Sequence, residues 1–422
     1  MPTARFAWPR AFIFRIAAGW PLCQPAPVSQ TCYTKPMRIH SLAVVVVVCA
    51  WQPALLRAQT PEAKQPSRRS ERGYDGPMNK VLLKDYNPAS NLVVPETHVA
   101  KAKFPVIDVH VHPAGQTPQQ VAEWVKIMDQ VGVETAVLLT GAVGPAFDRL
   151  VELYLKPYPN RFMLYCGIDT RNLDIEARDY PQKVAAELRR CYRMGARGVG
   201  EVTDKGRGFG AGTFADSDTL KPRDKRLHVD DRRLDLFWQT CAELHMPVNL
   251  HIADHPSAWQ PADERQERTP GFQRYNQHGL DVPSHAELIT RFHTLLERHQ
   301  KTTFVAVHFS NIGHDLAQLG RALDRFPNLN VDLSARAYEF GRQPFTAPAF
   351  FAKYKTRILY GSDQTVSAEM WRSWWRILET RDEFIKGPSW WRLYGMGLSD
   401  DVLEPVYRGN AKRLLNWIRP AF

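Results

Sequence analysis

Short apolar runs alternate with longer amphipathic stretches from residue 106 onward. Eight runs have the length and apolar character of buried parallel strands, at residues 106–112, 135–140, 162–168, 198–202, 247–252, 304–308, 329–333 and 358–361. Helical spacing of apolar residues occurs between them, at 119–131, 182–194, 234–244, 286–299 and 316–326. This alternation predicts a (β/α)8 TIM-type barrel over residues 103–422, with its active site at the carboxyl ends of the strands.

The connections after the fourth and fifth predicted strands are long. Residues 204–233 are rich in glycine and charge, and residues 253–283 combine cationic with aromatic side chains. We expect these two loops to shape a pocket for a polar substrate. For any single charged residue in them, exposure to solvent is the simpler interpretation.

Residues that bind metals stand at the ends of four predicted strands. His110 and His112 end the first strand, His251 lies at the end of the fifth, His308 ends the sixth, and Asp363 follows the eighth. The carboxyl ends of barrel strands converge, so we expect these side chains to meet. Imidazole and carboxylate groups together favour a divalent cation, most simply zinc. An isolated His-x-His pair is weak evidence. Together with the metal-binding residues at three further strand ends, it predicts a metal centre.

The first strand carries the strongest part of this pattern. Successive side chains of a strand alternate between its two faces. His110 and His112 should therefore point the same way, together with Asp108. The apolar residues between them should form the opposite face and pack against helices.

Positive charge is concentrated at the start of the chain. The 422 residues include 55 Lys and Arg against 44 Asp and Glu, a net charge of +11. Residues 1–58 contain six of the basic residues and no acidic one, which leaves 49 basic against 44 acidic residues, or +5, in the remainder. This small excess gives no reason to expect a nucleic-acid partner.

Residues 1–58 have the features of a targeting segment. Met37 and Arg38 precede an apolar run at 41–50, and Ala58 precedes a polar stretch. This order is typical of a secretory signal peptide cleaved after Ala58, so we expect export to the periplasm or the medium. The basic start of the signal favours Met37 as the initiator, with residues 1–36 as an upstream extension.

The apolar run is short for a membrane span, so no stable membrane insertion is expected after cleavage. An uncleaved anchor is the alternative. Residues 59–102 are polar and dotted with proline, and we interpret them as a linker followed by an N-terminal arm.

Several motifs resemble those of the amidohydrolase superfamily. Residues 107–112 read Ile-Asp-Val-His-Val-His, residues 361–363 read Gly-Ser-Asp, and a histidine lies at the end of the fifth and of the sixth predicted strand. Further matching segments are 158–162, 331–334 and 409–415. Within the superfamily, the chain resembles the amidohydrolase-related group that includes aminocarboxymuconate-semialdehyde decarboxylase. The resemblance covers residues 104–418, the whole predicted barrel.

The resemblance implies roles for the residues at the strand ends. His110, His112, His251 and Asp363 correspond to the ligands of a catalytic divalent ion. His308 corresponds to a histidine beside the metal that orients or protonates the substrate. Asp363 would also move a proton between the attacking water and the leaving group.

Glu201 lies near the end of the fourth predicted strand. Its role decides whether such a centre would hold one ion or two. Binuclear members of the superfamily carry a bridging group on this strand, either a carbamylated lysine or, in TatD-like nucleases, a glutamate. With Glu201 as the bridge, a second ion would use His251 and His308, leaving the other ligands to the first. A carboxylate that only supports the site or binds substrate is an equally simple alternative, with one ion per chain.

Three functions fit these residues. The main one is a metal-dependent hydrolase that directs activated water at a C–O, C–N or P–O bond of a small polar substrate, and Glu201 favours it. A metal-dependent nonoxidative decarboxylase is the alternative, favoured by the resemblance and by Arg336, which follows the seventh strand and is placed to bind a substrate carboxylate. A non-catalytic binding barrel is disfavoured because every expected ligand position is filled. The sequence specifies neither the substrate nor whether the chain forms a homo-oligomer.

Overall fold

The structure, a computed structural model, describes residues 76–211, 220–267, 270–387 and 391–415. The predicted extension and signal peptide, and the predicted linker up to residue 75, lie outside the described residues. The chain divides into two units, residues 1–88 and 89–422. The described part of the first unit contains two short 3-10 helices, η1 (Pro77–Lys80) and η2 (Leu83–Asp85). Within the described ranges, every helix is too short or too polar to cross a membrane.

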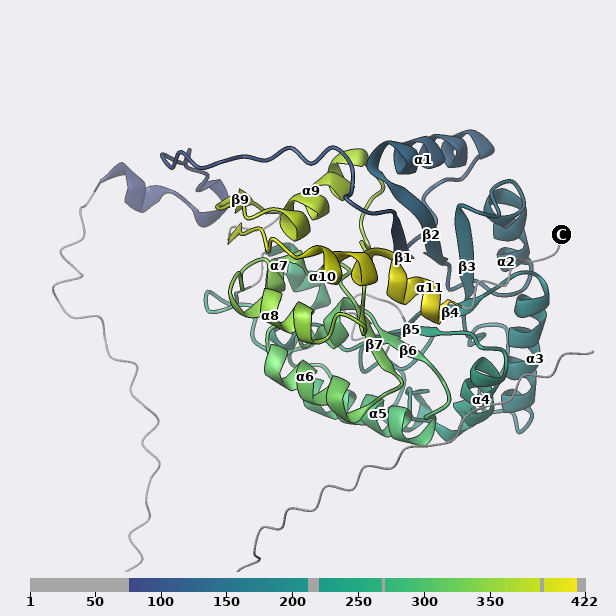
Figure 1. The fold of residues 1–422 in the computed structure, drawn as a ribbon. Helices are drawn as coiled ribbons and strands as arrows, with labels where there is room; N and C mark the ends of the chain where they lie inside the picture. Colours follow the sequence, from purple (N-terminus) through teal and green to yellow (C-terminus); the bar gives the residue numbers. More distant parts are fainter. Residues whose placement is uncertain (1–75, 212–219, 268–269, 388–390, 416–422) are drawn as a thin grey trace, which may run out of the picture. The chain divides into compact units, whose positions relative to one another are not determined.

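Eight parallel strands form one sheet in which each strand pairs with the next along the chain (Figure 1). They are β1 (Val106–Val111), β2 (Val133–Leu139), β3 (Phe162–Cys166), β4 (Gly198–Asp204), β5 (Val248–Ile252), β6 (Phe304–Ala306), β7 (Leu329–Asp332) and β8 (Ile358–Leu359). Helices follow the strands and cover the outside of the sheet. The predicted (β/α)8 barrel is confirmed, and the barrel is nearly closed.

The five predicted helices correspond to α1 and α3 to α6, with ends that agree within two residues. The helices are α1 (Pro118–Val131), α2 (Gly144–Leu150), α3 (Tyr180–Arg193), α4 (Asp235–Glu243), α5 (His285–Arg298), α6 (Leu316–Arg325), α7 (Ala337–Phe340), α8 (Thr346–Lys353), α9 (Ala368–Glu379), α10 (Asp400–Glu404) and α11 (Asn410–Leu414). Thr117 and Ser284 start α1 and α5 with reciprocal capping boxes, which fix the first turn of each helix. The sequence pattern does not predict α2 and α8, because both are short and carry a proline near their start.

Shorter elements complete the described chain. The π-helical turns are η3 (Val151–Leu155) and η10 (Pro405–Gly409), and β9 (Ile385–Lys386) pairs with β10 (Arg392–Leu393). The described parts of the long connections after β4 and β5 contain the 3-10 helices η5 (Arg223–Lys225), η6 (Arg232–Leu234), η7 (Pro256–Trp259) and η8 (Pro270–Tyr275). The 3-10 turn η9 (His308–Asn311) follows β6.

One buried cluster fills the inside of the barrel. It consists of Ile107, Val109, Val137, Leu139, Met163, Tyr165, Val305, Leu359, Ala411 and Leu415. Gly198 of β4 makes room for the largest member, because a Cβ at Gly198 would lie 2.2 Å from Cζ of Tyr165. A small residue opposite a large one is a common way to fill a tapering barrel interior.

β1 departs from the regular alternation that the sequence predicts. Its pairing with β2 contains two register shifts, the second between Asp108 and Val111. Ile107 and Val109 belong to the interior cluster, whereas the Asp108 carboxylate accepts a hydrogen bond from Nε1 of Trp371 in α9 (2.9 Å). The prediction that Asp108 shares a face with the two histidines is therefore wrong, and so is the prediction that Ile107 and Val109 face the surrounding helices. The irregular pairing turns its carboxylate towards α9.

β1 and the end of β8 are joined by backbone hydrogen bonds at the seam of the barrel. The N–H of Val109 donates to the carbonyl of Tyr360 (2.9 Å), and the N–H of Asp363 donates to the carbonyl of His110 (2.9 Å). Gly361 allows this close approach, because a Cβ there would lie 2.8 Å from Cβ of His110. The seam therefore brings Asp363 beside His110.

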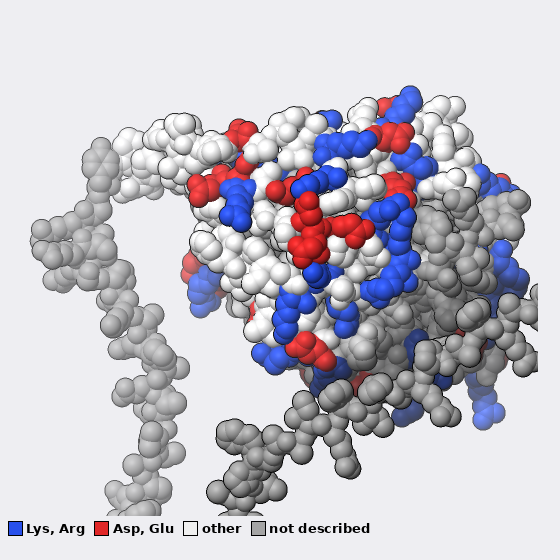
Figure 2. Space-filling view, in the orientation of Figure 1, with Lys and Arg blue, Asp and Glu red and all other residues white. Residues whose placement is uncertain are grey.

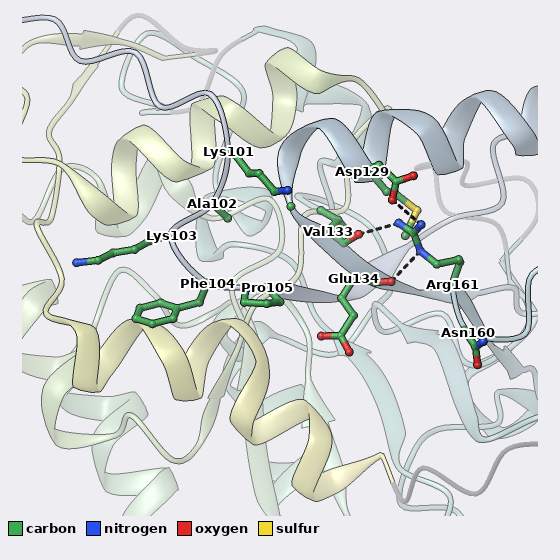
Figure 3. Close-up of a pocket in the computed structure, with 12 residues that line it drawn as sticks. Lys101, Ala102, Lys103, Phe104, Pro105, Asp129, Val133, Glu134, Asn160 and Arg161 are labelled. Atoms are coloured by element: carbon green, nitrogen blue, oxygen red, sulfur yellow. Dashed lines mark hydrogen bonds and ion pairs between the residues drawn. The ribbon is translucent and has the colours of Figure 1, made fainter.

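A pocket of about 640 Å³ opens at the amino ends of β1 and β2, away from the predicted site (Figure 3). Arg161 lines it and donates to the carbonyls of Val133 (2.9 Å) and Glu134 (3.0 Å) and to the carboxylate of Asp129 (2.6 Å). These bonds tie the start of β2 to the segment that enters β3. The matching segment 158–162 therefore has a structural role in this chain.

Charged side chains of both signs are interspersed on the face shown in Figure 2. Several described charges are paired, for example Lys355 with Asp401 (2.8 Å) and Arg190 with Glu187 (2.8 Å). The described residues on this face form no extended surface of one sign.

Candidate metal centre

The side chains predicted to hold a metal converge at the carboxyl end of the barrel. They lie at the end of β1, in β4 and β5, and directly after β6 and β8, and are His110, His112, Glu201, His251, His308 and Asp363. Two groups of three have ligand atoms that all lie within 4.8 Å of one another: His110 with His112 and Asp363, and His110 with Glu201 and His308. The structure thus brings the predicted residues together.

The first group surrounds one point with nitrogen and oxygen atoms. Oδ1 of Asp363 lies 3.6 Å from Nε2 of His110 and 3.1 Å from Nε2 of His112. Oε2 of Glu201 lies 3.9 Å and 3.5 Å from the same two nitrogens. Donor atoms bound to one ion at about 2.0–2.2 Å lie about this far apart. Nε2 of His110 is buried without a hydrogen-bond partner among the described residues, so this atom fits a metal ligand.

The other oxygen of Glu201 faces a second pair of imidazoles. Oε1 lies 2.6 Å from Nδ1 of His251 and 3.5 Å from Nε2 of His308, and the two rings are 4.5 Å apart between centroids. Oδ2 of Asp363 also approaches Nε2 of His308, at 3.8 Å. Glu201 therefore reaches both sets of ligands, one with each carboxylate oxygen.

Three of the imidazoles are oriented by hydrogen bonds on their far nitrogen. Nδ1 of His110 lies 2.9 Å from Oδ2 of Asp332, and Nδ1 of His112 lies 3.0 Å from the carbonyl of Leu139. Nδ1 of His308 lies 2.9 Å from the carbonyl of Ser334. Because these oxygens accept, each Nδ1 carries a proton, and Nε2 is the nitrogen of each ring that is placed to bind an ion.

The backbone is strained where it delivers these side chains. His308 and Asp363 have φ of 58° and 49°, and Ala253 and Ala335, at the ends of the neighbouring strands, have φ of 58° and 52°. Residues other than glycine adopt this left-handed region at a cost of about 1 kcal/mol or more. Such strain is typical of residues whose position serves a site.

Ionisation within the cluster also favours a bound cation. Burial opposes charge on Glu201, but His251 and His112 hold the pKa of this carboxyl well below its usual range. Burial likewise opposes charge on His110, yet Asp332 and Asp363 raise its pKa to about 9. Both effects show that positive charge is stabilised among these carboxylates. A divalent ion at the same nitrogens would supply that charge in place of protons.

Arg336 lies near this cluster but is engaged by the protein. It is 8% exposed and donates from Nη2 to Oδ1 of Asn311 and from Nη1 to the carbonyl of Ala335 (3.1 Å). Its Nε lies 3.7 Å from Oε1 of Glu339. Its predicted role as a substrate carboxylate binder remains a prediction.

A pocket of about 520 Å³ adjoins Glu201 on the side of β2, β3 and β4. Its lining includes Thr140, Gly141, Asp169, Asn172, Thr203 and Phe209. The loop after β4 contributes as predicted, but the sequence reasoning missed the loops after β2 and β3. Their position directly after predicted strands, at the catalytic end of a barrel, was the available signal.

The barrel and its cluster of imidazoles and carboxylates are the architecture of a metal-dependent enzyme. The chain belongs to the amidohydrolase family, whose model matches residues 107–417. The resemblance drawn from the sequence motifs is thereby confirmed. No curated protein sequence matches the chain.

Several solved structures are similar to the chain at low identity. The 2,6-dihydroxybenzoate decarboxylase from Rhizobium is 16% identical with a TM-score of 0.44, over 74% of this chain and 99% of that one. The 5-carboxyvanillate decarboxylase from Novosphingobium aromaticivorans, solved with manganese, is 14% identical with a TM-score of 0.45, over 76% and 100%. A probable 2-pyrone-4,6-dicarboxylic acid hydrolase from Acinetobacter baumannii is 12% identical with a TM-score of 0.43, over 74% and 100%. These similarities do not determine the reaction.

Proposed function

We propose that the protein is a hydrolase with two divalent ions bridged by Glu201, acting on a C–O, C–N or P–O bond of a small polar substrate. The observation that carries the proposal is the position of the Glu201 carboxylate. Oε2 faces His110 and His112, and Oε1 faces His251 and His308. A carboxylate with one oxygen towards each pair is placed to bridge two ions. The mixed nitrogen and oxygen donors suit zinc or manganese.

Divalent ions at such a centre lower the pKa of bound water to about 7 and polarise a carbonyl or phosphoryl oxygen. Asp363 is placed to take the proton of the attacking water, because it borders both sets of ligands and its side chain is 25% exposed. It can return that proton to the leaving group. His308 keeps Nε2 free of a proton, because Nδ1 donates to Ser334, so Nε2 can bind an ion or accept a hydrogen bond from substrate.

A nonoxidative decarboxylase is the second candidate. The group to which the chain shows resemblance includes such enzymes, and they work with a single ion. In that case Glu201 would support the site, and Arg336 would need to release Asn311 or Glu339 to bind a substrate carboxylate.

Metal content and reaction products separate the two candidates. We expect about two ions per chain by elemental analysis after supplementation with zinc or manganese, and metal-dependent cleavage of an ester, lactone, amide or phosphoester panel. Glu201→Ala should lose one ion and the activity while keeping its fold. Glu379→Gln, which alters a carboxylate of α9 outside the site, should retain both ions. One ion per wild-type chain, with carbon dioxide released from aromatic or enol acids, would replace the hydrolase by the decarboxylase.

We also propose that the segment before residue 59 directs export and is removed. The basic start and apolar run at 37–50 support this. N-terminal sequencing of the exported chain tests it, with Gln59 as the expected first residue. A mature chain that starts far from Gln59 contradicts the proposal.

A further inference from the structure

His251 is held differently from the other imidazoles of the site. The other three present Nε2 to the cluster and bond through Nδ1 to the surrounding protein. His251 does the reverse, with Nδ1 2.6 Å from Oε1 of Glu201 and Nε2 3.3 Å from Oδ1 of Asp254. Asp254 and Glu201 therefore hold this ring from its two sides, with Nδ1 towards the centre.

That partner is a buried carboxylate with its own cation. Oδ1 of Asp254 lies 3.0 Å from Nζ of Lys205, and both side chains are 6% exposed. The ammonium of Lys205 also lies 4.8 Å from the ring centre of Tyr275, so an aromatic face and a carboxylate enclose it. A buried carboxylate without a cation would be strongly disfavoured, so Lys205 keeps Asp254 ionised and in place.

The loops after β4 and β5 are joined where these two residues meet. The N–H of Ala253 donates to the carbonyl of Asp204 (3.0 Å), so the residues that follow each of them lie side by side. The buried carboxylate of Asp204 accepts from the N–H of Gly206 (3.0 Å) and bends the chain directly after Lys205. These backbone hydrogen bonds therefore place Lys205 and Asp254 next to each other.

We propose that Lys205 and Asp254 are positioning residues that hold His251 with Nδ1 towards Glu201 and so complete the site of the second ion. An ion at Nδ1 would leave the ring proton on Nε2, where Asp254 is placed to accept a hydrogen bond from it and hold the ring in this orientation. Neither residue belongs to the ligand set inferred from the sequence. The inference rests on the proposed two-ion hydrolase.

Metal affinity tests the pair without relying on turnover. Binding of manganese to the full chain is measured by competition with a chelating dye in wild type, Lys205→Met, Asp254→Leu and Lys205→Arg. We expect the second ion to bind about 10- to 100-fold more weakly in the first two variants, the usual effect of removing the partner of a ligand histidine. The first ion should bind as in wild type, and Lys205→Arg should restore most of the affinity. Lys126→Met, which removes an exposed ammonium paired with Glu123, is the matched control.

A double variant distinguishes a loss of the positioning of His251 from unfolding of the chain. Lys205→Met leaves a buried unpaired carboxylate and can unfold the chain for that reason alone. Lys205→Met combined with Asp254→Leu removes both charges, so it should keep the wild-type circular dichroism and unfolding midpoint while binding the second ion as weakly as Asp254→Leu. Wild-type affinity in the double variant and in Asp254→Leu overturns the inference.

The number of ions that the wild-type chain binds tests the proposed function separately. A wild-type chain that binds one ion overturns the two-ion hydrolase. The pair is then judged on that single ion: weaker binding in Asp254→Leu and in the double variant supports the positioning role, and unchanged binding overturns it.

Discussion

Asp332→Asn is the substitution that most directly tests how the first ion site is built. Asp332 is fully buried, and its Oδ2 lies 2.9 Å from Nδ1 of His110. Its Oδ1 accepts from the backbone N–H of His308 (2.9 Å) and of Ser334 (3.1 Å). In the variant, the amide oxygen keeps the place of Oδ1, because those two donors require an acceptor. The amide nitrogen must then face His110.

This exchange reverses one hydrogen bond and moves one proton. The amide nitrogen donates where the carboxylate accepted, so Nδ1 of His110 must accept and its proton moves to Nε2. Nε2 faces Asp363 and is the atom that would bind the ion. Loss of such a partner lowers metal affinity about 10- to 100-fold. That change corresponds to about 1.4 to 2.8 kcal/mol of binding free energy.

The assay is a competition titration of manganese or zinc against a chelating dye, with circular dichroism to confirm the fold. Asp324→Asn is the control, because this carboxylate is 57% exposed and pairs with Lys353 and the hydroxyl of Tyr354, away from the candidate metal centre. If Asp332→Asn binds the first ion as tightly as the wild type, the orientation of His110 by Asp332 is not what makes Nε2 a ligand, and the reasoning fails.

Two further substitutions test the barrel and its response to pH. Gly198→Ala should destabilise the fold by about 1–3 kcal/mol or more in urea unfolding, because the new Cβ meets the buried Tyr165 ring at 2.2 Å; an unchanged midpoint would show that the interior can yield there. Burial lowers the pKa of His285 from 6.5 to about 4, so the unfolded chain binds a proton between these values that the folded chain does not. Stability is then lost as pH falls from about 6.5 to 4, by up to about 3 kcal/mol for this residue. His285→Gln should flatten that part of the stability profile, and an identical profile would contradict the assignment.

The barrel could be predicted because its strands are buried on both faces. A segment such as 304–306 has no polar alternation to interpret, but its apolar run between amphipathic helices is enough to place a strand. Because such strands lack a polar alternation, their sequences do not reveal local irregularities in pairing. The register shifts of β1 that turn Asp108 towards Trp371 depend on pairing with β2 and packing of α9, and neither leaves a mark on the sequence of β1.

The clustering of the candidate ligand residues was predictable for a similar reason. Each stands at a strand end, and the barrel brings strand ends together. Their hydrogen-bond partners were not predictable in the same way, because a partner such as Leu139 contributes only a carbonyl, which any residue has. Asp254 stands in a loop among many charged residues, and only its contacts with His251 and Lys205 distinguish it.

The charge of the centre favours two ions over one. Asp332, Asp363 and Glu201 all have lowered pKa values and carry three negative charges at neutral pH. If all the imidazoles are neutral, one divalent ion leaves an excess of one negative charge, which a proton on an imidazole of the second pair would have to balance. Arg336 does not remove this excess, because it lies beside the buried Glu339. Two divalent ions leave one positive charge, which a single anion can neutralise. Because buried charge is tolerated only when it is balanced, the proposed two-ion hydrolase predicts that the centre binds two ions together with one anion, without a proton on any of its imidazoles.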